Sequence, residues 1–495
     1  MPQRYVIVAV TALAALWMYI DRVCFSTLAT PMKTELLLPH APDPSELDEP
    51  TPREVRAALE RKHNGTPPDG AALTAEEVAA AKRKKWVDDK MSYALGAFFL
   101  TYALFQIPMG NLADRFGARK VLALSIAAWS VVTMLTGFVM GALALLAIRL
   151  LLGITEAGAY PAAAGLVKRW ARPEERGRCS SIVALGGRIG GAIAPYITAF
   201  LATALVGVAL VEWVITPAAV PPGPDGKAPP NWRGVFVVYG FCGLVVAGLF
   251  WLVVRDNPPA PVAPAAPPPP EPAAQSAPDG AKEPELTMIQ RIGLLARTRN
   301  MWLFGGVQFG VNLGWAFLVT LLPTYLNDVF RTPLGEVGQM QSVALTIGIL
   351  GMIFGGVFTD VMRKKLGPKL GRSVPIAVTL SMCSVAFLLV PTLPSAWAVV
   401  IALGVMAFFV DMHNPSIWSF AQDVGGKNVG AALGWGNMWG NLGAAVSAVV
   451  LNKIQLAAGW NAAFVCCAIA FGCSALCGLM LDATKPVDEP TSPAV

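Results

Sequence analysis

The sequence predicts an all-α membrane protein whose twelve transmembrane helices form two six-helix bundles. Hydrophobic residues make up 55% of the 495-residue chain and charged residues only 14%, against about 25% in a soluble protein. Apolar windows of about 20 residues, the length that crosses a bilayer, recur twelve times. A stretch built largely of Pro and Ala divides them six and six. Together these observations exclude a soluble globular protein.

The twelve spans are apolar stretches separated by charged or turn-forming residues. The first contains Asp21 and Arg22 and has no small-residue cleavage site, so we expect a retained helix rather than a cleaved signal peptide. We place the spans near residues 4–30, 91–113, 118–140, 142–168, 178–205, 232–254, 299–327, 338–362, 374–391, 396–421, 428–455 and 459–481.

Two insertions interrupt this pattern. Residues 33–90 separate the first two spans, and their last part looks like an amphipathic surface helix with Thr74 and Glu77 as a capping box. Residues 256–286 are too rich in Pro and Ala to form a core, which predicts an extended linker. The domains expected are an N-terminal bundle (1–254), a cytoplasmic linker (255–297), a C-terminal bundle (298–481) and a cytoplasmic tail (482–495).

Basic residues gather after even-numbered spans, at Arg115, Arg119 and Lys120, from Lys168 to Arg178, and from Arg363 to Arg372. Cytoplasmic loops carry such an excess, so we expect a multi-pass plasma (inner) membrane protein with both termini cytoplasmic. The basic run Lys82–Lys85 falls on the outside, against the pattern, but in a long loop where the rule is weaker. The eight cysteines have no metal-ligand spacing, which favours packing roles and predicts no metal site.

The two halves repeat one motif. Gly110 to Lys120 reads GNLADRFGARK after the second span, and Gly355 to Lys365 reads GGVFTDVMRKK after the eighth. Both copies place an Asp before a basic cluster, as in a parallel repeat. The fourth span carries Arg149 and Glu156 on one helix face, about 10 Å apart along the axis. A charge near the bilayer centre costs several kcal/mol, which indicates a protein that moves something charged.

These motifs resemble the major facilitator superfamily. GNLADRFGARK is similar to its signature loop, and Arg149 with Gly153 and Gly158 resembles its span-four motif. Within the superfamily the chain is similar to the anion:cation symporter family, whose members carry hexuronates, other sugar acids and other anions. That second resemblance rests on Tyr19–Arg22, Tyr102, Gln106, Pro108, Gly110, Gly153–Pro161, Arg169–Trp170, Glu175–Arg176, Trp232–Arg233, Phe236, Asp423–Gly426 and Asn437–Asn441. The two insertions depart from the family pattern.

The resemblance implies a substrate site between the two bundles at mid-membrane, in agreement with transporters in general. Arg22 and Arg188 are the candidates for binding an anion, because a guanidinium stays charged and can hold a carboxylate through two parallel bonds. The alternative is that each arginine only neutralises a neighbouring acid. Candidates to line the site are Tyr19, Tyr102, Gln106, Asn437 and Asn441, and also Tyr160, Gln308, Asn312 and Trp315; hydrogen bonds between helices are the alternative for the amides.

Asp21 and Glu156 are the candidates for proton coupling, with Arg149 tuning Glu156. A buried carboxyl group beside an arginine can gain and lose a proton as water access changes sides; the alternative for Asp21 is a permanent ion pair. Asp411 is a further coupling candidate or the partner of a buried arginine, and His413 a pH switch or a packing residue. Asp114, Arg115 and Arg119 are expected to form a gate, with Asp114 capping a helix.

We therefore expect a transporter rather than an enzyme, with proton-coupled symport of an organic anion such as a hexuronate or other sugar acid by alternating access. Protons would be the coupling ion and no cofactor is expected; the partners would be the anion and the lipid bilayer, without nucleic acid, and the protein a monomer. Sodium-coupled or exchange transport of another carboxylate or an inorganic anion is the alternative. A membrane enzyme is disfavoured because the three histidines, at 40, 63 and 413, form no catalytic motif. A sensor would be expected to have lost its mid-membrane acids.

Overall fold

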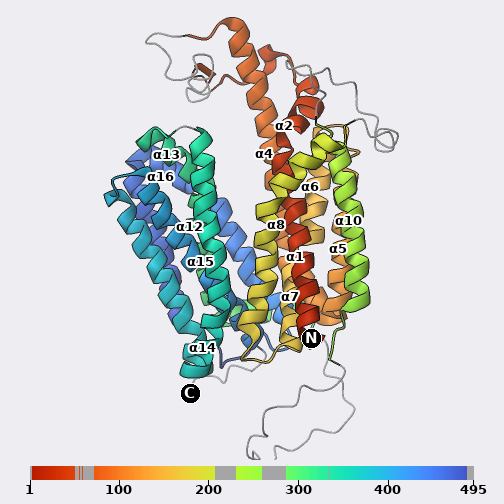
Figure 1. The fold of residues 1–495 in the computed structure, drawn as a ribbon, viewed down its shortest axis with the longest axis vertical. Coiled ribbons are helices and arrows are strands. Elements are labelled where there is room, and N and C mark those ends of the chain that lie inside the picture. Colours follow the sequence, from red (N-terminus) through yellow and green to blue (C-terminus); the bar gives the residue numbers. More distant parts are fainter. Residues whose placement is uncertain are drawn as a thin grey trace, which may run out of the picture.

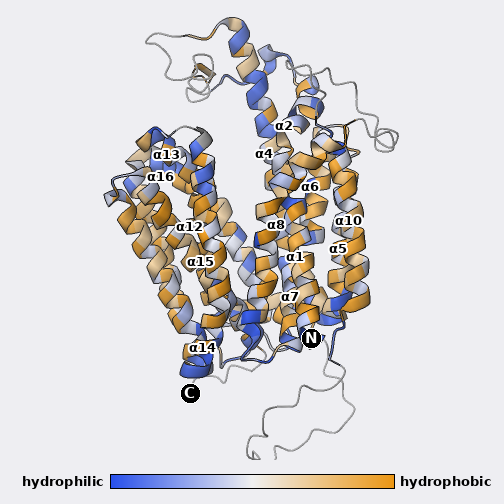
Figure 2. Ribbon diagram, in the orientation of Figure 1, coloured by the Kyte–Doolittle hydropathy of each residue, from blue (hydrophilic) through white to orange (hydrophobic). Residues whose placement is uncertain are grey.

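A computed structural model describes residues 3–50, 72–206, 230–258, 286–332 and 334–487, together with residues 55, 58 and 59. All regular structure in these residues is helical, which confirms the predicted all-α class. The helices stand side by side in two bundles (Figure 1). Their outer faces are mostly apolar, and polar residues gather at the ends (Figure 2).

Each bundle is built from one half of the chain. The first contains α1 (Gln3–Thr27), α4 (Ala75–Phe116), α5 (Ala118–Thr136), α6 (Ala142–Glu156), α7 (Ala159–Trp170), α8 (Arg176–Ala204) and α10 (Trp232–Val253). The second contains α12 (Arg299–Ala316), η4 (Phe317–Leu321), α13 (Leu322–Phe330), α14 (Leu334–Leu389), α15 (Ala396–Val424) and α16 (Val429–Leu479). Short helices are α2 (Ala29–Met32), η1 (Lys33–Leu37), η2 (Leu38–His40), η3 (Pro44–Glu46), α11 (Met288–Arg297) and η5 (Val390–Thr392).

Ten helices in the described part of the chain are long and apolar enough to cross a membrane. Two long helices each contain a glycine with positive φ, Gly367 in α14 (φ 76°) and Gly459 in α16 (φ 82°), where the direction changes. With α14 taken as two spans and the first arm of α16 added, the helices correspond to the predicted twelve. The basic stretch from Arg363 to Arg372, expected as a loop, is instead helical on both sides of Gly367.

The insertion after α1 differs from its prediction. Its last part is not a separate surface helix but the start of α4, whose 42 residues span about 60 Å, twice the hydrocarbon thickness of a bilayer. Thr74 and Glu77 form the predicted capping box. Nζ of Lys33 lies 2.7 Å from a carboxylate oxygen of Asp88, which ties the projecting turns to the end of α1. Most of residues 51–71 and of the predicted 256–286 linker, and the tail beyond 487, lie outside the described residues.

The bundles contact each other at the end that holds both chain termini, which we call the terminal end (Figure 1). Nη2 of Arg372, in the second bundle, donates there to the carbonyl of Pro173 in the first, at 3.1 Å. Asp114 of α4 accepts from the backbone amides of Gly430 and Ala431 at the start of α16, at 2.9 and 3.0 Å. The predicted cap on a neighbouring helix therefore joins the two bundles.

Asp360, the Asp of the second motif copy, makes the mirror-image contact. It accepts from the amides of Gly177 and Arg178 at the start of α8, at 2.9 and 3.1 Å, and from Nε of Arg178 at 3.1 Å. Each bundle therefore caps one helix of the other, where a negative charge is stabilised by the helix dipole. The repeat is visible in the sequence, but no role was predicted for Asp360 from it.

Further contacts reinforce the terminal end. We call the contacts of Asp114, Asp360 and Asp423 at this end the gate. Asp423 of α15 pairs with Arg176 of the first bundle and with Arg372 of its own bundle. Arg119, expected in the gate, instead contacts its own bundle: its amide and side chain donate to Asp256 and to the Trp251 carbonyl. The Arg115 guanidinium lies 5.2 Å from the ring centre of Phe116.

Replacing Asp114 with Ala should separate the bundles at the terminal end. The loss of a capping carboxylate costs about 1–2 kcal/mol, which shifts an equilibrium by roughly five- to thirtyfold. Spin labels on Arg172→Cys and Lys365→Cys, one in each bundle, should show longer distances by pulsed electron paramagnetic resonance. Asp89→Ala, on the projecting part of the same helix, is the control. A distance distribution identical to that control would contradict the role given to Asp114.

Candidate functional site

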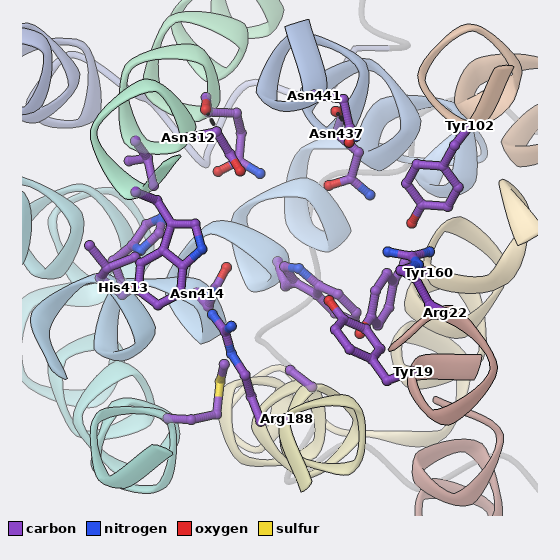
Figure 3. Close-up of a pocket in the computed structure, with 17 residues that line it drawn as sticks. Tyr19, Arg22, Tyr102, Tyr160, Arg188, Asn312, His413, Asn414, Asn437 and Asn441 are labelled. Carbon is purple, nitrogen blue, oxygen red and sulfur yellow. Dashed lines mark hydrogen bonds between the residues drawn. The ribbon is translucent and has the colours of Figure 1, made fainter. Parts of the chain in front are cut away.

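A cavity of about 200 Å³ lies between the bundles (Figure 3). This volume is below the about 300 Å³ at which ordinary ligand pockets begin, so it suits a small ligand. Helices α1, α4, α7 and α8 line one side, and α12, α14, α15 and α16 the other. The lining residues are Tyr19, Arg22, Tyr102, Tyr160, Ala184, Arg188, Gln308, Val311, Asn312, Trp315, Met352, Val410, His413, Asn414, Trp418, Asn437 and Asn441.

Arg22 of α1 carries a positive charge into this cavity. Its Nε and Nη2 donate to one carboxylate oxygen of Glu156, at 3.2 and 2.7 Å. Its guanidinium also lies 4.5 Å from the ring centre of Tyr102 and 5.2 Å from that of Tyr19, where the ring faces attract a cation. The side chain keeps 16% of its surface exposed, whereas Glu156 keeps none. The arginine therefore faces the cavity and its partner lies behind it.

The fold places Glu156 by a close approach of two helices and a helix break. A Cβ on Gly153 would clash with the carbonyl oxygen of Phe98, so α6 packs directly on α4. The hydroxyl of Thr101 donates to the carbonyl of Leu150 across this contact, at 2.9 Å. Helix α6 ends at Glu156, and α7 begins at Ala159. The predicted fourth span is thus interrupted beside its acid.

Arg188 of α8 is the second arginine at the cavity, and it connects the bundles. Its guanidinium donates to Asp411 of α15 and lies 4.8 Å from the ring centre of Trp315 of α12. The arginine keeps 26% of its side-chain surface exposed and Asp411 only 1%. Arg188 points into the cavity from α8 (Figure 3). Asp411 therefore partners an arginine, as in one of the two roles expected for it, but this arginine is partly exposed to the cavity.

Amide side chains line the part of the cavity formed by the second bundle. Asn312 donates to the carbonyl of Gln308 and Asn441 to that of Asn437, one helical turn away, at 2.9 and 2.8 Å. Nδ2 of Asn437 donates to Oε1 of Gln106 across the bundles, at 3.3 Å. Of these three bonds, the one from Asn437 to Gln106 joins two helices, as in the alternative considered for the amides, whereas those of Asn312 and Asn441 stay within their own helices. All three asparagines line the cavity.

Several predicted residues do not reach the cavity surface. Gln106 is fully buried and lies behind Asn437. Asp21 is 1% exposed, and neither of its carboxyl oxygens has a hydrogen-bond partner among the described residues. Arg149 is 2% exposed and lies over the rings of Phe25 and Phe98, at 4.0 and 4.7 Å. The permanent ion pair considered for Asp21 is therefore absent from the described structure.

His413 lines the cavity, with Nδ1 against the carbonyl of Val410 in its own helix. The cavity is also lined by Asn414, Trp418 and Met352, which were not predicted to lie there. Trp418 meets Tyr160 of the other bundle edge to face, with ring centres 5.0 Å apart. Whether Met352, Asn414 and Trp418 face the cavity depends on the rotation of α14 and α15 about their axes, for which the sequence carries no signal.

The arrangement can bind a small anion. Two arginines face one cavity, and each is partnered by a carboxylate that lies behind it. Amides and tyrosine rings supply hydrogen-bond donors and acceptors around the charges. Among the described residues, no group of three or more His, Cys, Asp or Glu could hold a metal ion.

Comparisons with known proteins agree with this geometry. A probable sulfoacetate transporter of Cupriavidus necator is 30% identical over 410 residues, 82% of this chain and 88% of the relative. A probable galactarate/D-glucarate transporter of Escherichia coli (strain K12) is 29% identical over 431 residues, 83% of this chain and 89% of the relative. These relatives confirm the resemblance to transporters of sugar acids and other organic anions.

Solved structures share the fold. The human organic anion transporter MFSD10 (TETRAN) has a TM-score of 0.65 at 15% identity, covering 97% of this chain and 100% of that one. The fucose:proton symporter FucP of E. coli has a TM-score of 0.59 at 14% identity, covering 97% and 98%. The family model of the Major Facilitator Superfamily matches residues 11–448. The chain therefore belongs to the Major Facilitator Superfamily, and it is a membrane transporter rather than an enzyme.

Proposed function

We propose that the protein is a proton-coupled symporter of a small organic anion, of the sugar-acid kind, that works by alternating access. The observation that carries the proposal is the ion pair of Arg22, at the cavity surface, with the fully buried Glu156. The names of the relatives support the substrate class, because sulfoacetate, galactarate and D-glucarate are all small organic anions. Protons serve as the coupling ion, without a cofactor.

The ion pair suggests how the proton and the substrate are coupled. A substrate carboxylate that binds the Arg22 guanidinium competes with Glu156 for the same donors. A carboxylate left without its partner in a dry site is costly, so Glu156 takes up a proton as the substrate binds. Release of the substrate on the other side returns Arg22 to Glu156, which then gives up the proton. Proton and anion are thereby carried together.

The gate gives the second part of the mechanism. Asp114 and Asp360 hold the terminal end closed in this conformation, and breaking both caps would allow the bundles to rock and open that end. We place both termini on the cytoplasmic side, because the basic residues lie there. The conformation described here then offers its cavity to the outside. We treat the functional unit as a monomer, since each chain contains a complete cavity.

The test of this function is uptake by the purified protein in proteoliposomes with an imposed pH gradient. The panel holds sugar acids, sulfoacetate, other carboxylates and phosphate. We expect an inward-directed proton gradient to drive accumulation of at least one sugar acid or sulfoacetate. Accumulation driven by sodium alone, or only by exchange against internal anion, would show sodium-coupled or exchange transport in place of proton-coupled symport. Absence of uptake of every organic anion would refute the proposal.

Replacing Glu156 with Gln should separate binding from coupling. Glutamine can still accept a hydrogen bond from Arg22 but cannot carry a proton, so we expect loss of pH-driven accumulation. Exchange of labelled for unlabelled substrate should persist, because it needs no net proton movement. Both are measured in the same liposomes. If Glu156→Gln still accumulates substrate against a gradient at the normal rate, Glu156 is not the coupling acid.

Replacing Arg22 with Gln should abolish binding rather than coupling. Loss of a buried charge-assisted contact costs about 2–5 kcal/mol, so substrate affinity should fall at least roughly thirtyfold, measured by calorimetry in detergent. Because this change leaves Glu156 unpaired, the double variant Arg22→Gln/Glu156→Gln serves as a second test without a buried lone charge. Arg83→Gln, at an exposed site on α4, is the control. Unchanged affinity in the double variant would remove Arg22 from the binding site.

A further inference from the structure

The cavity contains two arginine–carboxylate pairs of the same design. Arg22 with Glu156, and Arg188 with Asp411, each place a partly exposed guanidinium at the cavity and a buried carboxylate behind it. The function proposed above uses only the first pair. The second pair lines the same cavity and has the same chemistry, but the proposed function gives it no role.

The two pairs differ in one respect. Arg22 and Glu156 lie on α1 and α6, inside the first bundle, whereas Arg188 lies on α8 and Asp411 on α15, in opposite bundles. The Arg188–Asp411 contact is therefore a link between two bodies that must move relative to each other. A substrate group that takes Arg188 away from Asp411 removes this link. A substrate that binds Arg22 alone leaves it in place.

The surroundings of Asp411 are poor in other charges. Gly348 of α14 lies against its carboxyl group, and Asn414 is within reach on its own helix. The titratable or charged groups of the described chain that face Asp411 or Arg188 are Cys383 of α14, His413 of α15, Tyr19 of α1 and Tyr160 of α7. None of these carries a permanent positive charge, so Arg188 is the fixed counter-ion of the Asp411 carboxylate.

Charge balance then fixes the number of protons that accompany a dianion. The two pairs of the empty cavity sum to zero charge. If a dianion binds both arginines and each displaced acid takes one proton, the sum is again zero. A monoanion at Arg22 with one proton on Glu156 also sums to zero, because the second pair then stays intact. A dianion accompanied by only one proton would instead leave a net charge in the middle of the bilayer, at a cost of several kcal/mol.

We propose that Arg188 and Asp411 form a second exchange unit, which makes the protein a transporter of small dianions that carries each dianion together with two protons. The inference rests on the proposed function and extends it from one acid to two. A sugar diacid and a sulfonate–carboxylate such as sulfoacetate share the required chemistry. Each has two anionic groups joined by a short polar or carbon chain, one for each arginine.

The first experiment measures the number of protons. Proteoliposomes receive a fixed outward gradient of a six-carbon sugar diacid, and the pH difference that stops net flux is measured. For two protons it is half as large as for one, and the flux is independent of membrane potential. A balance point at one proton per diacid would overturn the inference. No flux of any organic anion would instead refute the proposed function, and the inference with it.

Substitutions test whether Asp411 takes the second proton and whether Arg188 determines the preference for a diacid over a monoacid. Asp411→Asn cannot take a proton, so diacid flux should become dependent on membrane potential and balance at one proton. The double variant Arg188→Gln/Asp411→Asn leaves no unpaired buried charge, and the ratio of kcat/KM for the diacid to kcat/KM for the matching six-carbon monoacid should fall roughly 10- to 100-fold. Arg188→Lys should retain the preference for the diacid.

Control variants and a second substrate class distinguish substrate binding by Arg188 from a purely structural role of the Arg188–Asp411 pair. Asp89→Asn and Arg83→Gln change exposed residues on the projecting part of α4 and should match the wild type in both measurements. Sulfoacetate and its monoanionic analogue acetate repeat the comparison for the sulfonate class. Equal loss of monoacid and diacid transport in the double variant would mean that the pair only holds the bundles together, and would overturn the assignment of Arg188 as the second anion site.

Discussion

The ion pair between Arg22 and Glu156 is the contact on which the cavity depends. Each charge stabilises the other here, since an unpaired charge in the hydrocarbon core costs several kcal/mol. The surroundings hold the pair in place: the contact at Gly153 brings α6 against α4, and tyrosine rings flank the guanidinium. Because the carboxylate is buried and the arginine exposed, the anion of a substrate meets the positive partner first.

The cavity and the gate share two helices, α8 and α15. Helix α8 begins at the Asp360 cap and carries Arg188 about 16 Å further along its axis. Helix α15 carries Asp411 and, about 18 Å away, Asp423 of the gate. A rigid rotation of one bundle against the other changes both regions together. The gate caps use backbone amides as donors, so they require only an Asp and a helix start on the opposite bundle.

Much of the fold could be predicted from the sequence. The spans follow from apolar length alone, and the capping box of Thr74 and Glu77 follows from a local pattern that tertiary contacts do not override. Arg22 and Arg188 were found because a charge in an apolar span needs a use. The extent of α4 was missed, since helix propensity does not show whether a surface helix continues into a span. Asp360 was missed because its partner amides lie 183 residues away.

The sequence did not show which buried carboxylate forms an ion pair with which arginine. Asp21 in the first span and Glu156 in the fourth carry the same kind of side chain, yet Glu156 pairs with an arginine, whereas neither carboxyl oxygen of Asp21 has a hydrogen-bond partner among the described residues. The rotation of each helix about its axis decides this, and it depends on contacts such as Gly153 with Phe98 that join distant segments. The sequence by itself determined the membrane class, the two six-span halves and the presence of charges in the spans, because these depend on hydropathy and local order. The tertiary structure alone decided which charges pair, which face the cavity and which close the gate, because an ion pair forms only where packing brings both side chains within reach.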